Sequence, residues 1–203
     1  MPKRLRIPAF SQSDFGWSYL LMALVAITLP VLTIIRPLVQ WIRGSTLVTS
    51  VMLPHGMDLT TPLSGARVWE STLTVEIAQA STTAWLAHLG RGVLLTAVVW
   101  WVLYLLGRLL RSVQDGTPFR AENVTRLRVA GVVVMAGAIV WMFYNGLINP
   151  ILLGEVVPAH GVMWLAQLSY GSLLVVGFGV LLTVVAEVFQ RGVRLEEDAE
   201  GVI

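Results

Sequence analysis

The sequence predicts an all-α membrane protein with four transmembrane helices and a small external β element between helices one and two. Apolar residues make up 56% of the 203-residue chain and charged residues only 13%, about half the charged share of a soluble domain. Four apolar stretches are long enough to cross a hydrocarbon core. This composition excludes a soluble globular enzyme and a disordered chain, and it favours a single membrane domain over residues 1–203.

The four predicted spans follow from long apolar runs, of which the first contains no charged residue. The first run, 15–35, is too long for the core of a signal peptide, so we expect it to stay as a helix. Pro30 lies inside it, which membrane helices tolerate. The other predicted spans are 92–110, 127–148 and 162–189.

The distribution of basic residues predicts how these spans are oriented. Ten of the 14 lysines and arginines lie at the N-terminus, around the 111–126 connection, or in the 190–203 tail. Basic residues are enriched on the cytoplasmic side of membrane proteins. We therefore expect both termini in the cytoplasm and the 37–91 and 149–161 connections outside.

The long external segment carries a strand signal. Residues 68–77 alternate between apolar and polar side chains, with Val75 and Ile77 on the apolar face, and residues 46–53 are a weaker partner strand. An isolated two-stranded ribbon is marginal in water, so its apolar face must pack on the outer helix ends, on further strands or on another protomer. The element is then either a lid that completes the core or a sensing surface.

The cytoplasmic connection has the most informative local sequence. Asp115-Gly116 predicts the end of a helix, and Thr117 and Pro118 predict the cap and first residue of a helix that continues into the third span. Its arginines anchor the corner or form a docking surface for a cytosolic partner or anionic lipid head groups. The candidate docking residues, which include three acids of the tail, are Phe119, Arg120, Asn123, Arg126, Arg128, Glu196, Glu197 and Asp198.

Two further polar features lie at the end of the fourth span. Glu187 and Arg191 are four residues apart, which favours a structural intramembrane ion pair. The acidic tail that follows can pair with the arginines of the connection or attract a basic protein.

No residue pattern predicts catalysis. The chain has no cysteine, and its three histidines, His55, His88 and His160, are far apart without the spacing of metal ligands. Motifs for hydrolases, zinc proteases and phosphate-binding loops are missing from the sequence. We therefore expect no enzyme, no cofactor and no metal, and the basic segments are too short for direct nucleic-acid recognition.

Two motifs carry a resemblance to a known family. These are the Gly116-Thr-Pro-Phe119 turn with Asn123, and the end of the fourth span from Glu187 through Arg191 to Asp198. With four spans and a β-like segment after the first, the chain resembles the uncharacterised bacterial membrane proteins of domain of unknown function 2975 (DUF2975). The resemblance implies a multi-pass protein of the bacterial plasma membrane and a frequent genomic pairing with a small helix-turn-helix regulator. It implies no catalytic residues.

Three functions remain open from the sequence. The leading hypothesis is a non-enzymatic sensor or anchor in the lipid bilayer that binds a cytosolic partner such as a helix-turn-helix regulator. The alternatives are a small permease or lipid-handling protein, and a structural subunit of a membrane complex. Homo-oligomerisation is compatible with each of them.

Overall fold

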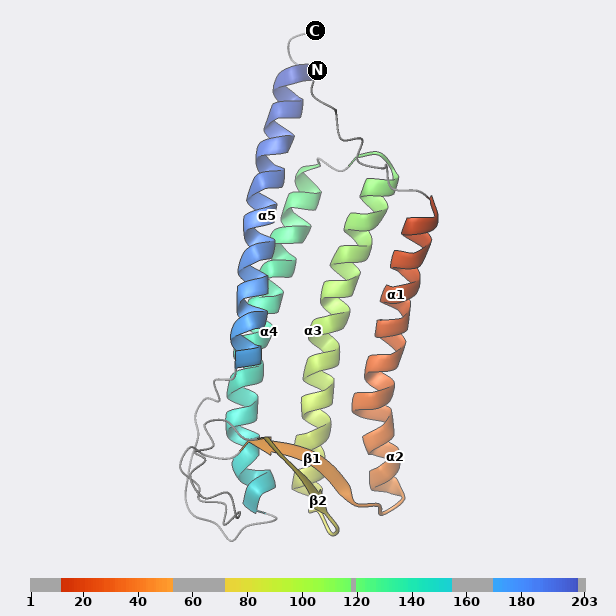
Figure 1. Ribbon diagram of the computed structural model, residues 1–203, viewed down its shortest axis with the longest axis vertical. Helices are drawn as coiled ribbons and strands as arrows, with labels where there is room; N and C mark the ends of the chain where they lie inside the picture. The colour runs from red at the N-terminus through yellow and green to blue at the C-terminus, as the bar shows by residue number, and fades with distance from the viewer. Residues whose placement is uncertain (1–11, 53–71, 118–119, 155–169, 201–203) are drawn as a thin grey trace, which may run out of the picture. The chain divides into compact units, whose positions relative to one another are not determined.

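The computed structural model describes residues 12–52, 72–117, 120–154 and 170–200 (Figure 1). Within these residues, four helical stretches are long and apolar enough to cross a membrane: Phe15–Ile42, Thr82–Gln114, Ala121–Leu152 and Tyr170–Leu195. The first comprises α1 (Gln12–Pro30), a π-helical turn (Val31–Ile35) and α2 (Arg36–Ile42); it is followed by β1 (Leu47–Met52), β2 (Thr72–Ile77), α3 (Thr82–Gln114), α4 (Ala121–Gly154) and α5 (Tyr170–Glu200). The predicted four helices and the β element are confirmed.

The helices are longer than the spans that the sequence predicted. The first helical stretch continues to Ile42, and α3 begins at Thr82 rather than at residue 92. Both helices therefore occupy residues that the prediction assigned to the external segment. Ser81 precedes α3 and caps it. Its Oγ accepts a hydrogen bond of 3.2 Å from the Ala84 N–H, as N-cap residues do. Hydropathy marks the edge of the hydrocarbon, whereas helical hydrogen bonding continues beyond it.

A proline interrupts the first helix, and α3 supplies a hydrogen bond that the proline removes. Pro30 has no N–H to donate to the carbonyl of Ala26, four residues earlier. The indole Nε1–H of Trp100 donates to that oxygen instead, at 2.9 Å. The turn after Pro30 is π-helical, and the Arg36 N–H bonds the carbonyl of Val31 five residues back. This arrangement explains how an apolar helix accommodates Pro30.

The chain divides into two compact units, which we describe separately. The first unit contains Met1–Leu29, Ala97–Ala136 and Leu174–Ile203, and the second contains Pro30–Thr96 and Gly137–Leu173. Each unit has a buried apolar cluster of its own.

The second unit buries one face of an antiparallel ribbon. β1 pairs with β2 in a register that runs from Leu47 opposite Ile77 to Met52 opposite Thr72. Leu47, Val75 and Ile77 are buried, while the alternate residues Val48 and Glu76 are exposed. The buried side chains pack on residues of α3 and α4, namely Ala84, Trp85, Ala87, Ile148 and Leu152. The ribbon therefore packs on helix ends, one of the three partners that the sequence left open.

Polar contacts and an aromatic stack fasten the ribbon and α2 to the helices of the second unit. Arg91 donates from Nη1 to the carbonyl of Ser50 at 3.1 Å and from Nη2 to Asn149 Oδ1 at 3.2 Å. His88 Nδ1 lies 3.1 Å from Thr49 Oγ1. The indole rings of Trp41 and Trp85 stack with their centroids 6.1 Å apart. Arg91 and His88, which the sequence placed in a connection, thus belong to a helix that holds β1.

In the first unit, two glycines allow α4 and α5 to approach closely. A β-carbon added to Gly179 would lie 2.9 Å from the carbonyl oxygen of Gly131, and one added to Gly131 would lie 2.7 Å from the carbonyl oxygen of Gly179. Small residues permit such approach between membrane helices without a G-x-x-x-G motif. Nearby side chains of the same two helices complete an apolar cluster of Val124, Leu127, Ala186 and Val193.

We expect Gly179→Ala to destabilise the protein by about 1–3 kcal/mol, because its new methyl group would lie 2.5 Å from Cγ of Met135 and 2.9 Å from the backbone carbonyl oxygen of Gly131, which cannot move aside as a side chain can. Gly177→Ala is the matched control in the same helix, since a β-carbon there meets nothing within 4 Å. The control should be neutral or slightly stabilising, because alanine favours helix over glycine. Thermal unfolding in detergent micelles measures the difference, and equal midpoints for the two variants would contradict the close approach.

Candidate interaction surface

The corner where α3 ends and α4 begins is closed by backbone hydrogen bonds. Gly116 has a φ of +73°, a conformation that glycine adopts without strain. Its N–H bonds the Val113 carbonyl at 3.1 Å, and the Thr117 N–H bonds the Ser112 carbonyl at 3.1 Å. These two bonds define a Schellman motif. The predicted helix end at Asp115-Gly116 is therefore confirmed.

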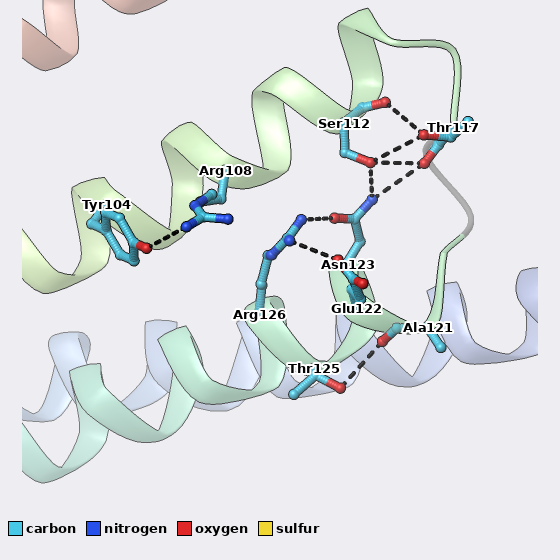
Figure 2. Close-up of polar contacts among 9 residues, drawn as sticks. All are labelled: Tyr104, Arg108, Ser112, Thr117, Ala121, Glu122, Asn123, Thr125 and Arg126. Atoms are coloured by element: carbon cyan, nitrogen blue, oxygen red, sulfur yellow. Dashed lines mark hydrogen bonds and ion pairs between the residues drawn. The ribbon is translucent and has the colours of Figure 1, made fainter.

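A buried asparagine connects α4 to this turn (Figure 2). Asn123 is 0% exposed, and its Nδ2 donates to Ser112 Oγ at 2.7 Å and to the Thr117 carbonyl at 3.4 Å. Ser112 Oγ in turn donates to the Thr117 carbonyl at 2.8 Å. On the other side, Asn123 Oδ1 accepts a hydrogen bond of 2.8 Å from Arg126 Nη1. We call Ser112, Thr117, Glu122, Asn123 and Arg126 the α3–α4 corner.

The start of α4 differs from the prediction. The helix begins at Ala121, three residues after Pro118, and the Arg120 carbonyl accepts from the Asn123 N–H at 2.9 Å. Thr117 does not cap α4, because its Oγ1 lies 3.4 Å from both the carbonyl and the hydroxyl of Ser112. The Schellman turn holds Thr117 against the end of α3. Thr117 also precedes the first residue of α4, Ala121, by four positions, whereas an N-cap residue directly precedes its helix. Phe119 lies outside the described residues.

The structure changes the interpretation of Asn123 and Arg126 as surface contacts. Asn123 is buried and holds the corner together, so it is not positioned to meet a partner directly. Arg126 is engaged by Asn123 and by Glu122, whose carboxylate lies 2.8 Å away; the Arg126 side chain is 22% exposed. A polar group buried without a partner costs more than an exposed one, which explains why the buried Asn123 pairs with Arg126.

The predicted Glu187–Arg191 pair is present and includes a third residue. Arg191 Nε lies 4.0 Å from Glu187, and Arg128 Nη2 lies 3.5 Å from the same carboxylate. Arg128 also donates to Gln190 Oε1 at 2.9 Å, which joins α4 to α5. The Arg128 and Glu187 side chains are about half exposed, and such ion pairs stabilise a protein by at most about 1 kcal/mol in water.

Other arginines of the first unit are exposed and have no side-chain partner among the described residues. These are Arg111, Arg120 and Arg194. The backbone of Glu196, Glu197 and Asp198 is helical and continues α5, while their side chains lie outside the described part. Among the sequence-predicted docking residues that the structure describes next to the α3–α4 corner, Arg120 is exposed and forms no ion pair with another described side chain.

Sequence reasoning missed two contributors near the corner. Ser112 bonds both Thr117 and Asn123, and only the fold of the turn reveals this role. Arg108 lies over the ring of Tyr104, with its Cζ 5.3 Å from the centroid, and donates to the Tyr104 hydroxyl at 2.8 Å. Tyr104 and Arg108 are four residues apart in one helix, a spacing from which this contact could have been predicted.

The described residues offer no cluster for a metal ion: none brings three histidine, aspartate or glutamate side chains together. His88, which lies in the second unit, hydrogen-bonds Thr49 within the fold. The polar groups that the first unit does bring together are arginines, amides, hydroxyls and the paired carboxylates of Glu122 and Glu187. Their arrangement is suited to fixing a corner and presenting positive charge.

Within the described residues, the protein has four helices that are long and apolar enough to cross a membrane, and one two-stranded antiparallel ribbon. Residues 70–203 match the model of the family DUF2975, described as "Protein of unknown function". The chain belongs to this family, which confirms the resemblance. Comparisons with curated proteins and with solved structures give no match.

We expect Asn123→Ala to loosen the α3–α4 corner, because it removes the donor to Ser112 and leaves buried polar groups unpaired. The stability loss should be about 1–3 kcal/mol. Hydrogen–deuterium exchange should accelerate at the amides of residues 112–117. Glu122→Gln is the control, because Glu122 is 72% exposed and its ion pair contributes little. Unchanged exchange in Asn123→Ala would show that the asparagine does not hold the turn.

Proposed function

We propose that this chain is a non-enzymatic integral membrane protein that binds a soluble partner through its first unit, as a sensor or an anchor. One observation carries the proposal. α5 continues as a helix to Glu200, beyond Leu195 at the end of its apolar stretch, and the exposed Arg120 and Arg194 belong to the same unit. A helix that extends past its apolar stretch gives a folded surface outside the hydrocarbon.

The corner supports the proposal because it holds the backbone of Arg120 at the start of α4. Asn123 bonds to Ser112 and to the backbone of Thr117, and its N–H bonds the Arg120 carbonyl. The backbone of Arg120 is therefore held to the first turn of α4, one residue before the helix begins. A surface that is ordered before binding loses less conformational entropy when a partner docks.

The charges of α5 indicate what kind of partner would fit. Arg194 is followed within one turn by Glu196, Glu197 and Asp198 on the same helix. A partner must then present acidic groups to the arginines and basic groups to the helix end. A small helix-turn-helix regulator, the partner that the family resemblance implies, carries a basic DNA-binding face that suits the acidic end. Recruitment requires this end of the protein to face the cytoplasm, as the basic residues predict.

We expect Arg120→Gln/Arg194→Gln to weaken recruitment of a co-expressed helix-turn-helix regulator by about five- to tenfold, since rim charges contribute modestly to affinity. Co-purification from membranes at several salt concentrations measures the effect. A second variant that ends at Leu195 keeps both arginines but lacks the acidic residues Glu196, Glu197 and Asp198. It should lose their contact with the basic face of the regulator and also retain less partner.

The matched control is Arg36→Gln/Arg43→Gln, which makes the same charge change at exposed arginines of the second unit. This control should recruit as well as the unmodified protein. Equal recruitment by all variants, or equal loss in the control, would refute the assignment of docking to the first unit.

A further inference from the structure

A groove in the first unit combines positive charge with an apolar floor. It has a volume of about 530 Å³, opens to the surface, and lies between Tyr19 of α1 and one stripe of α3. The α3 residues that line it are Leu103, Tyr104, Gly107, Arg108, Arg111 and Gln114. Their spacing of three and four residues places them along a single helix face.

The polarity of the groove changes along α3. Leu103, Tyr104 and Gly107 lie towards the middle of the helix, within its apolar stretch. Arg108, Arg111 and Gln114 lie in its last two turns. Gln114 accepts a hydrogen bond of 3.1 Å from the Tyr19 hydroxyl, which ties the polar end to α1. An apolar floor followed by a basic end matches an acyl chain followed by a charged head group.

The two arginines of the groove are free to receive an anion. Arg108 is held by the Tyr104 ring and hydroxyl (Figure 2), and neither Arg108 nor Arg111 has an ion pair within the described residues. Among the residues that the structure describes, no carboxylate lines the groove. The Schellman turn already satisfies the carbonyls of Ser112 and Val113, so the arginines are not occupied in capping α3. Guanidinium groups bind phosphate through paired N–H donors.

We propose that this groove binds an anionic phospholipid, with the phosphate held by Arg108 and Arg111 and an acyl chain against Leu103 and Gly107. The lipid is preferred over a soluble phosphate because the groove continues into the apolar part of α3. The site also lies at the helix end that the basic residues predict to be cytoplasmic, where anionic lipids gather. The proposal does not depend on the proposed soluble partner.

The test titrates the full-length protein in neutral detergent with phosphatidylglycerol and follows thermal unfolding, because a ligand of the folded state raises the unfolding temperature. Phosphatidylglycerol should raise the midpoint saturably, whereas phosphatidylcholine and inorganic phosphate at the same concentrations should not. Arg108→Gln/Arg111→Gln should need roughly thirtyfold more phosphatidylglycerol, as expected for two arginines at a lipid surface.

The matched control is Arg120→Gln/Arg194→Gln, which makes the same charge change in the same unit but outside the groove. It should respond to phosphatidylglycerol like the unmodified protein, although we expect it to recruit the soluble partner poorly. If the groove variant does not fold, Tyr104→Phe removes the hydroxyl that positions Arg108 and should weaken the response several-fold.

Three results would overturn the proposal. An equal response to phosphatidylcholine would remove the role of charge, and an equal response to inorganic phosphate would remove the role of the acyl chain. An equal loss in the control variant would show that total charge, rather than this groove, attracts the lipid.

Discussion

The need to satisfy backbone polar groups within the chain governs this structure, because hydrocarbon offers them no water. At Pro30 the Ala26 carbonyl receives its hydrogen bond from Trp100. The helices that end at Ile42 and Gln114 are both closed by glycine turns, at Gly44 and Gly116. On the ribbon, Arg91 donates to the carbonyl of Ser50. The proline and the two helix ends interrupt regular structure, and at each of them a donor from the chain itself bonds a backbone carbonyl.

The features that the sequence predicted well are those with a local physical cause. Apolar runs located four helices, and the alternation up to Ile77 located a strand whose buried and exposed residues were assigned correctly. Helix starts were predicted less well, because α3 begins at Thr82 and α4 at Ala121 according to hydrogen bonds rather than hydropathy. Thr117 shows the reason: its sequence favours a cap for α4, but the turn at Gly116 holds it against Ser112.

The candidate surface was predictable by residue type but not by role. Arg120, Asn123 and Arg126 stand close together in the sequence, yet one is exposed, one is buried and one is paired. Arg128 finds its partner Glu187 59 residues away, a distance at which no local pattern operates. The groove likewise requires α1 beside α3, which hydropathy cannot place. The orientation of the termini stays a prediction from the distribution of basic residues.

The ribbon of the second unit has a consequence for how the protein is made. β1 and β2 can pair once residue 77 has been synthesised. Leu47, however, is buried against Ile148 and Leu152, which are synthesised about seventy residues after residue 77. At an elongation rate of about 5–20 residues per second, the apolar face of the ribbon waits several seconds for its cover. During that interval the nascent chain exposes the apolar face of the ribbon, which a chaperone or insertase would need to cover.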